Sequence, residues 1–573
     1  MDLHQRYSTS SPDADAAEKQ IREQTVSPIE SRQGIHGGEN EERTRLHRGL
    51  KARHITMIAI GGAIGTGLII GTGKALAQAG PGSIFISYTI VGLLVYLVMC
   101  ALGEMAAWLP LSSGFTGYAA RFCDPALGFA LGYTYWFKYI IVTPNQLTAG
   151  ALIIQYWVDR DRVNPGVFIA VFWVAIVCIN YFGIRFFGEF EFWLSTIKVI
   201  VIVGVIILSL VLALGGGPDH DRKGFRYWSD PGAFAEYIED GATGRFLAFW
   251  STMVTATFAY LGTELVGVTV GEAQNPRKTI PRAIKLTFYR ILFFYCLSVL
   301  LLGMLVPYDS EELAFANKAS SSASASPFVV AVKLAGITAL PGILNGCILL
   351  FVFSASNSDL YIASRTLYGL ASEGHAPALF RRTDSRGVPV YALGLSAAFA
   401  LLAFMNVADD SKTVFGYFVN LVTIFGLLTW ISILVAHICF VRARRAQAVP
   451  SAALAYTAPL GVAGSYGALA MCILIALTKN FAVFVRSPSS YGAFDYKNFI
   501  TGYLGIPLYL AMIAGYKWWT RCRRVRPAEA DLWTGKDAID REEEEFLAEK
   551  ARKDAATKGR RGWFYRTFVA WLF

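Results

Sequence analysis

The sequence is poor in charge and in the residues that build metal centres and disulfide frameworks. Only 16% of its 573 residues are charged, and it contains 7 His and 8 Cys. The cysteines show neither a paired metal-ligand spacing nor a secreted framework, so they predict no metal site and no disulfide scaffold. No segment has the alternation of barrel strands, which leaves helices. We also find no nucleophile–base or metal constellation, so we expect neither an enzyme nor a bound cofactor.

The sequence has long apolar runs instead. Hydrophobic residues make up 54% of the chain and aromatic residues 14%, which is too apolar for a soluble domain of this length. A helix needs about 20 apolar residues to cross the hydrocarbon core of a bilayer. Charge-poor runs predict an all-α polytopic membrane protein with about twelve spans, numbered here in chain order: 55–73, 83–109, 127–157, 166–184, 193–214, 246–270, 287–307, 328–356, 389–407, 414–439, 462–485 and 500–519.

The polar ends and the basic residues predict the orientation of these spans. Residues 1–50 are polar and show no secretory signal, so we expect a disordered cytosolic tail there, a transmembrane domain at 51–520 and a second cytosolic tail at 521–573. Twelve spans place most of the flanking Lys and Arg residues inside, whereas the loop at 215–245 lies outside. This positive-inside bias puts both termini in the cytosol. It also explains the net charge of +10 without a nucleic-acid partner.

Glycine placement points toward a function. Span 1 reads IAIGGAIGTGLIIGTG, with six glycines in one would-be helix, and span 6 reads TFAYLGTELVGVTVGEAQNP, with three glycines around Glu264. Each Gly destabilises a helix interior by about 0.5–1 kcal/mol relative to Ala. Glycine-interrupted spans at corresponding places in two halves are typical of transporters built from inverted repeats. Alternatively, the glycines only allow close helix packing.

Five motifs carry a resemblance to a known family. The runs GGAIGTGLIIGTG, ALGEMAAWLP, RFCDPALGFALGYTYW, FAYLGTELVG and EAQNPRKTIPRAI resemble the fungal amino-acid permeases of the amino acid–polyamine–organocation (APC) superfamily. This resemblance implies a LeuT-like fold of twelve helices, with a five-plus-five inverted repeat and broken helices 1 and 6.

Four further runs narrow the resemblance within that family. The runs FKYIIVTPNQLTAGALIIQYWVDRDRVNPGV, GGGPDHDRKGFRYWSDPGAF, VFSASNSDLYIASRTLYGLA and REEEEF…WFYRTF look like the dicarboxylic amino-acid permeases of this family. They imply proton-coupled uptake of glutamate and aspartate at the plasma membrane.

An amino acid needs donors for its carboxylate and acceptors for its ammonium, and spans 1 and 6 offer both. Half-helix amino termini present free N–H groups to an anion. The resemblance implies that the α-carboxylate is held by the backbone of Gly65, Thr66 and Gly67. We expect a second group, in the break of span 6, to contact the α-amino group and the side chain: Phe258, Ala259 and Leu261. Phe258 acts as an aromatic gate or, alternatively, packs in the core.

An acidic substrate adds a second carboxylate, whose pocket should hold donors and few acids. Many relatives carry a Pro-x-Glu-Leu stretch in span 3, where this chain has Pro144-Asn145-Gln146-Leu147. The exchange removes a repulsion of about 4 kcal/mol between like charges 4 Å apart at an effective dielectric near 20. Lys138 lies two helical turns before Asn145 on the same face. Its ammonium faces the substrate or, alternatively, extends to the cytosolic interface.

Proton coupling needs a titratable group near the site. Resemblance to related proton-coupled transporters indicates Lys198 in span 5, whose ammonium would take the place of a sodium ion in sodium-driven relatives. Glu264 is the alternative carrier, or a structural acid that satisfies the broken backbone of span 6. We expect Glu104 and Asp359, which lies after predicted span 8, to be structural. Two residues complete the polar wall of the site: Asn357 and Ser358.

Three other functions compete with this reading. The short amino-terminal region disfavours a non-transporting sensor, and the absence of a repeated filter disfavours a channel. A broad-range or neutral amino-acid permease is the more serious rival, and competition for uptake separates it from an acidic amino-acid carrier. Besides the substrate and the lipid bilayer, we expect ubiquitin-ligase adaptors as partners of the cytosolic tails, through lysines such as Lys19.

Overall fold

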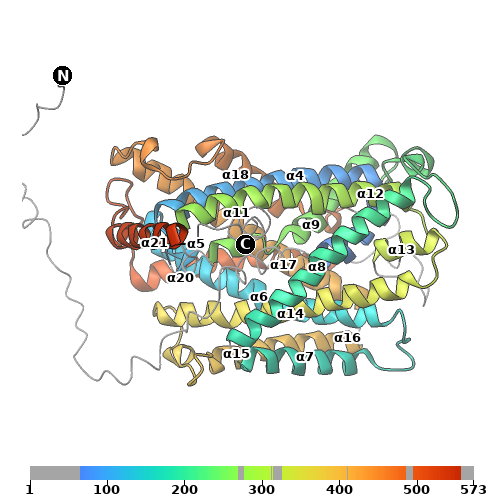
Figure 1. Ribbon diagram of the computed structural model, residues 1–573, viewed down its shortest axis with the longest axis horizontal. Helices are drawn as coiled ribbons and strands as arrows, with labels where there is room; N and C mark the ends of the chain where they lie inside the picture. Colours follow the sequence, from blue (N-terminus) through green and yellow to red (C-terminus); the bar gives the residue numbers. More distant parts are fainter. Residues whose placement is uncertain are drawn as a thin grey trace, which may run out of the picture. The chain divides into compact units, whose positions relative to one another are not determined.

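The computed structural model describes residues 65–111, 113–182, 184–268, 276–311, 313, 326–408, 411–485 and 494–556. The predicted tail at 1–50 and the last residues of the chain, 557–573, lie outside these ranges. Most of the long helices run roughly parallel to one another, and α8 (Ile184–Ala213) crosses them at an angle (Figure 1). This helical body confirms the expected all-α fold.

The helices follow the predicted spans in chain order. The described part of span 1 and all of span 2 lie in a π-helical turn, η2 (Gly67–Gly71), and in α4 (Thr72–Trp108). The short helix α5 (Gly114–Phe122) lies between spans, and α13 (Pro327–Leu334) overlaps the start of predicted span 8. Spans 3 to 12 correspond to α6 (Pro125–Ile154); α7 (Pro165–Tyr181); α8; α9 (Gly241–Tyr260) with α10 (Leu265–Val268); α11 (Pro276–Arg290) with η5 (Ile291–Leu297) and α12 (Ser298–Leu305); α14 (Leu340–Ser372); α15 (Val390–Ala400) with η7 (Leu401–Phe404) and α16 (Met405–Ala408); α17 (Ser411–Ala446); α18 (Gly461–Thr478); and α19 (Tyr496–Tyr503) with α20 (Gly505–Thr520).

Length and hydropathy alone find fewer membrane spans than this correspondence. Among the described residues, seven helical stretches are long and apolar enough to cross a bilayer, or eight if the bent pair α19–α20 is one span. The stretch Gly67–Trp108 contains both span 1 and span 2, and α7 has only 17 residues. In α6 and α9, buried polar residues lower the hydropathy of the span. Polar side chains that face protein are tolerated inside a membrane domain.

Spans 1 and 2 form a hairpin within α4. Gly80 has φ 82° and ψ 168°, which interrupts the helix, and Pro81 follows it. The Tyr88 hydroxyl lies 3.4 Å from the Gly67 carbonyl oxygen, although 21 residues separate them. In a straight helix that separation would place them about 31 Å apart. The chain therefore reverses at Gly80, because glycine adopts a positive φ without strain and proline starts a helix readily.

The loop at 215–245 caps this reversal. The amide of Gly82 donates to the carbonyl of Ala233 at 2.8 Å, and the amide of Ala235 donates to the carbonyl of Ala79 at 3.0 Å. The loop also contains a π-helical turn, η3 (Trp228–Gly232). The loop is therefore an ordered cap, and it satisfies backbone groups that the break in α4 leaves free.

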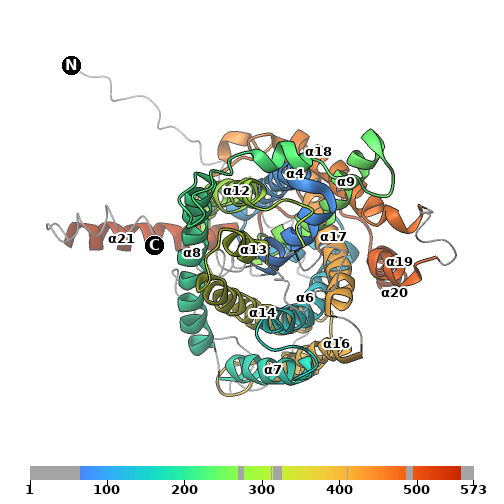
Figure 2. The ribbon, with the colours of Figure 1, turned by 90° about the vertical axis from the view of Figure 1, so that its right-hand side faces the viewer.

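Burial separates central helices from outer ones. In the most apolar stretch of α17, 89% of the residues are buried inside the protein, against 39% in α8. Figure 2 shows α6 and α17 near the centre of the bundle and α7 and α8 at its margin. Apart from Glu189 near the start of α8, the exposed side chains described on this helix are apolar, including Trp193, Ile200 and Ile207. This apolar face is not covered by other parts of the protein, so it suits contact with lipid.

The predicted bounds of span 8 are wrong. Instead of one span at 328–356, the structure has the short α13 and then a separate α14 that runs from Leu340 to Ser372. The polar run SASNSD in α14 lowers its hydropathy, which ended the predicted span too early. Most of these polar side chains are buried against other helices. Asp359 therefore lies within the membrane helix rather than after it.

The segment that follows the last span docks against the membrane body. We call residues 521–535 the docked segment. The Trp108 indole N–H donates to the carbonyl of Leu532 at 3.0 Å, and Leu532 is fully buried. Arg121 contacts Asp531 at 2.7 Å. The predicted cytosolic tail at 521–573 thus begins with a packed segment, and α21 (Lys536–Ala556) follows it.

Candidate functional site

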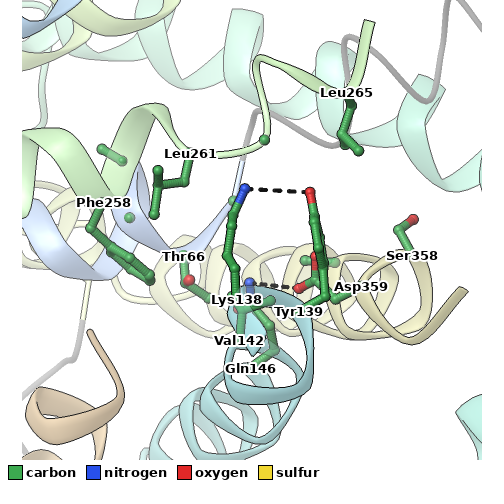
Figure 3. Close-up of a pocket in the computed structure, with 15 residues that line it drawn as sticks. Thr66, Lys138, Tyr139, Val142, Gln146, Phe258, Leu261, Leu265, Ser358 and Asp359 are labelled. Carbon is green, nitrogen blue, oxygen red and sulfur yellow. Dashed lines mark hydrogen bonds between the residues drawn. The ribbon is translucent and has the colours of Figure 1, made fainter. Parts of the chain in front are cut away.

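A pocket lies between the start of span 1, α6, the break of span 6 and α14 (Figure 3). Most of the predicted site residues line it, and they come from all four of these elements: Gly65, Thr66, Gly67, Lys138, Gln146, Phe258, Ala259, Leu261 and Ser358. Four predicted residues are outside its lining: Asn145, Lys198, Glu264 and Asn357. Sequence reasoning therefore located the pocket but not every group around it.

Span 6 is interrupted beside this pocket. Helix α9 ends at Tyr260, Leu261 is extended with φ −61° and ψ 143°, and Gly262 has φ 95°. The next helix, α10, begins at Leu265. Because Gly262 takes a conformation that side chains disfavour, the Leu-Gly-Thr-Glu sequence ends the helix locally. The predicted break in span 6 is confirmed.

Span 1 meets the end of α9 through its backbone. The described chain begins at Gly65, and Gly67–Gly71 forms a π-helical turn, a geometry common at functional sites. A Cβ atom on Gly67 would lie 2.8 Å from the backbone nitrogen of Ala259, closer than real Cβ atoms approach. Only glycine at this position lets the two backbones touch. The rest of the predicted break, residues 61–64, lies outside the described residues.

Several buried polar atoms at the pocket have no partner. The Thr66 hydroxyl, the Ser358 hydroxyl and the Gln146 carbonyl oxygen make no hydrogen bond within the described protein. All three residues line the pocket. Leaving a buried polar atom unpaired costs about 1–3 kcal/mol, so the arrangement favours a polar ligand that pairs with them.

A buried ion pair stands at the pocket wall. The Lys138 ammonium pairs with the carboxylate of Glu264, and the two side chains are 2% and 1% exposed. The Tyr139 hydroxyl lies 3.5 Å from the same ammonium (Figure 3). Glu264 also accepts from the Gly262 amide at 3.1 Å and from the Trp430 indole at 3.3 Å. The alternative that Lys138 extends to the cytosolic interface is wrong, while the backbone-capping role of Glu264 is present.

Asp359 is the charged pocket residue that sequence reasoning missed. It lines the pocket, and its carboxylate accepts from the Gln146 amide at 3.3 Å (Figure 3). It also interacts electrostatically with Lys138 and Lys198. The expected structural role assumed a position after span 8, which the true bounds of α14 correct. An acid inside a membrane span is a functional candidate by default, and that signal was available.

Two predicted amide residues lie behind the pocket wall. Asn145 is fully buried, and neither atom of its side-chain amide has a partner among the described residues. Asn357 accepts from the Asn180 amide at 3.0 Å and is not part of the lining, whereas its neighbour Ser358 is. The expected polar wall is therefore formed by Ser358 and Gln146.

Lys198 forms a second buried pair away from the pocket. Its ammonium lies 3.6 Å from Glu191 on the same helix, and the side chains are 1% and 0% exposed. Glu191 accepts from the Ser354 hydroxyl at 2.6 Å and from the Ser195 hydroxyl at 3.3 Å. These contacts join α8 to α14. The structure thus places Lys198 behind α14, within electrostatic range of Asp359.

Glu104 does not line the pocket, and its contacts are with other parts of the protein. Its carboxylate accepts from the Ala458 amide at 2.8 Å and lies 3.4 Å from His437 and 3.7 Å from Arg444. These partners join α4, α17 and the segment before α18. The contacts agree with the structural role that the sequence predicts for this acid.

Comparison with known proteins agrees with this architecture. The sequence model described as "Amino acid permease" matches residues 54–528. The chain is 54% identical to the dicarboxylic amino acid permease of Saccharomyces cerevisiae over 538 residues, covering 93% of this chain and 88% of that one. It is 40% identical to the general amino-acid permease of the same yeast, covering 92% and 86%.

A solved structure supports the same fold. The manganese transporter of Eremococcus coleocola superposes with a TM-score of 0.52 at 11% identity, covering 85% of this chain and 96% of that one. At this identity the likeness concerns the fold alone, which is LeuT-like. The family match spans most of the chain, and the two yeast permeases align along nearly all of it. The chain belongs to the amino acid permease family.

Proposed function

We propose that this protein carries glutamate and aspartate into the cell together with protons, by alternating access across the plasma membrane with both termini in the cytosol. The observation that carries the proposal is Lys138 in the lining of a pocket between the start of span 1 and the break of span 6. Broken spans of this kind form the substrate sites of LeuT-like transporters. The 54% identity to a dicarboxylic amino acid permease supports the same substrate class.

The pocket offers a partner for each charged group of an acidic amino acid. The α-carboxylate binds the backbone amides of Gly65–Gly67 and the Thr66 hydroxyl. The α-ammonium binds Asp359 and the end of α9 at Phe258, whose ring closes over the substrate and packs against Phe415. The side-chain carboxylate of the substrate binds the Lys138 ammonium and accepts a hydrogen bond from the side-chain amide of Gln146.

Asn145 acts differently from Gln146 in this proposal. Asn145 lies behind the wall and makes no contact with the substrate. Gln146 takes the position of the glutamate in the Pro-x-Glu-Leu stretch of related permeases, so it also contributes by the absence of a negative charge. A like charge there would oppose an anionic side chain by several kcal/mol in a low-dielectric site.

Proton coupling is required by the charge of the substrate. Glutamate carries one net negative charge inward against a negative-inside potential, which opposes each charge by about 2.3 kcal/mol per 100 mV. One proton makes the cycle neutral, and two let the potential drive it. We propose Glu264 and Lys198 as the titratable groups. Addition of glutamate at acidic outside pH should then give an inward current, whereas outward or absent current with intact uptake would reject two protons per cycle.

A broad-specificity permease is the second candidate. The 40% identity to a general amino-acid permease favours it, and so does Asp359, which suits the ammonium of any amino acid. Competition of labelled glutamate uptake by unlabelled aspartate, alanine and lysine separates the two. We expect strong inhibition by aspartate alone. Near-equal inhibition by all three would indicate a broad-specificity permease rather than a carrier of acidic amino acids.

The cytosolic tails are proposed to bind regulatory partners. Lysines of the two cytosolic tails, such as Lys19, offer sites for ubiquitin-ligase adaptors that control the amount of carrier at the cell surface. Replacing these lysines with arginine should prolong the surface lifetime of the protein without changing its substrate affinity.

A further inference from the structure

The Lys138–Glu264 pair has one member at the pocket and one behind it. Lys138 belongs to the pocket lining, whereas Glu264 does not, and both are almost fully buried. Lys138 is therefore the member of this pair that a substrate in the pocket can reach. An anion that enters meets a cation whose charge is already balanced by Glu264.

We propose that the side-chain carboxylate of the substrate replaces Glu264 as the partner of Lys138, and that Glu264 then takes up the transported proton. This exchange rests on the proposed function, and it assigns one coupled proton to Glu264 rather than to Lys198. It also explains why an acidic side chain, rather than any amino acid, brings that proton with it.

Lys138 is held in a way that allows its partner to change. Besides Glu264, its ammonium contacts the Tyr139 hydroxyl at 3.5 Å and lies 5.1 Å from the ring of Tyr135 and 4.7 Å from that of Tyr139. Cation–π contacts stabilise an ammonium without neutralising it. These rings keep the ammonium at the wall while one carboxylate replaces another. The substrate carboxylate has the same charge and the same acceptor geometry as that of Glu264.

Glu264 is poorly placed to stay ionised once Lys138 turns to the substrate. Its remaining hydrogen-bond donors are neutral, the Gly262 amide and the Trp430 indole. A buried carboxylate that loses its hydrogen-bonded cation takes up a proton more readily. The other charged or titratable groups that interact with it are Arg290 on α11 and Tyr135 and Tyr139 on α6.

The charges balance in this exchange. Before binding, the pocket wall holds one ammonium and one carboxylate. Afterwards it holds the ammonium, the substrate carboxylate and a neutral Glu264, so this pair takes up one proton with each acidic substrate. Because coupling between two bound species is reciprocal, the proton strengthens substrate binding by the same factor as the substrate strengthens proton binding. A neutral side chain such as that of glutamine would leave the pair intact.

The test measures glutamate binding and proton uptake with the purified full chain in detergent. Three proteins are compared: the wild type, Glu264→Gln, and a matched control in the second buried pair, Glu191→Gln. For the wild type and the control we expect about one proton taken up per bound glutamate, and an affinity that falls about tenfold per pH unit at alkaline pH. For Glu264→Gln we expect no proton uptake and an affinity that changes less than about twofold over the same range.

A second variant keeps the test decisive if the single variant does not fold. Lys138→Met/Glu264→Gln removes both charges, and such neutral replacements of a buried pair are usually tolerated. We expect it to bind glutamine at least as well as glutamate, without pH dependence. Proton uptake that survives in Glu264→Gln or in the double variant, or disappears in Glu191→Gln alone, overturns the exchange but leaves acidic uptake by the wild type standing. Failure of the wild type to bind glutamate would instead reject the proposed function.

Discussion

Two buried lysine–glutamate pairs lie in the membrane body, and they differ in what surrounds them. Lys138 pairs with Glu264 at the pocket wall, between α6 and the break of span 6. Lys198 pairs with Glu191 on α8, where serine hydroxyls of α8 and α14 also bond to the acid. One pair borders a space that a ligand enters, and the other is enclosed by protein.

This difference separates a pair that can exchange its partner from one that cannot. A buried ion pair is weak evidence for stability, because desolvation offsets the attraction between its charges. Its retention therefore needs another explanation in each place. At the pocket that explanation is recognition of an anion, and behind α14 it is the fixed packing of two helices. Asp359, which interacts with both lysines, lies between the two regions.

The largest effect is expected from a change that destroys the pocket-side region altogether. Gly67→Ala would place a Cβ atom 2.8 Å from the backbone nitrogen of Ala259, where neither backbone has room to move. Spans 1 and 6 would then separate, and we expect glutamate uptake to fall at least about a hundredfold, as for strain that misplaces a binding group. The measurement is uptake per molecule of carrier at the cell surface.

A glycine elsewhere provides the control. A Cβ atom added at Gly204 on α8 would meet no neighbouring atom of the described residues within 4 Å. The variant Gly204→Ala should therefore transport normally. Equal uptake by the two variants would mean that the backbone contact between the two spans is not needed, and the comparison of the two pairs would lose its basis.

The next effect sharpens the comparison directly. Lys138→Met removes the partner of a binding carboxylate, and truncating one member of a buried charged pair costs about 2–5 kcal/mol in binding. We expect the apparent affinity for glutamate to fall at least about thirtyfold. Lys138→Met and Lys198→Met both leave a glutamate buried without its cation, at about 3–5 kcal/mol in stability. Lys198→Met should therefore lower only the amount of folded protein, whereas Lys138→Met should also lower the affinity of the protein that folds.

A double variant distinguishes packing from proton transfer at the second pair. Glu191→Gln/Lys198→Met leaves no unpaired charge, so folded protein should return and glutamate should still accumulate against its gradient. Normal binding without accumulation would show that Lys198 carries the proton, as the resemblance to related transporters implies. The two regions would then share the coupling.

The sequence predicted the spans and most of the pocket because both leave local signals. Charge-poor runs mark the spans, and glycines at Gly67 and Gly262 mark the places where the chain must approach another backbone or adopt a positive φ. These signals depend on a few neighbouring residues, so no knowledge of the distant chain was needed to locate the pocket.

Other parts of the site could not be predicted because they depend on contacts across the bundle. The pairing of Lys138 with Glu264 joins residues 126 positions apart. Nor did the sequence show that Asn145 lies behind the wall while Gln146 lines it. Neighbouring residues of a helix point in different directions, and the sequence alone does not show which of the two faces the pocket. Asp359 was misplaced because polar residues that face protein look, in a hydropathy profile, like the end of a span.

The smallest effect is expected from an ion pair that lies outside both regions, between Arg121 and Asp531 of the docked segment. Burial opposes ionisation of Asp531, but hydrogen bonds from Thr534 and Arg121 outweigh it and lower its pKa. The pair therefore stabilises the docked segment above the ordinary aspartate pKa, and this contribution is lost as pH falls through the lowered value. Because 46% of Asp531 is exposed, water screens the pair, and surface pairs contribute about 0–1 kcal/mol.

Asp531→Asn should speed proteolysis of the docked segment a few-fold at neutral pH, approaching the rate that acid produces in the wild type. Glutamate uptake should stay within about twofold, and Glu529→Gln, in a more exposed pair, should change neither rate. A loss of uptake as large as that of Lys138→Met would mean that the docked segment acts on the pocket.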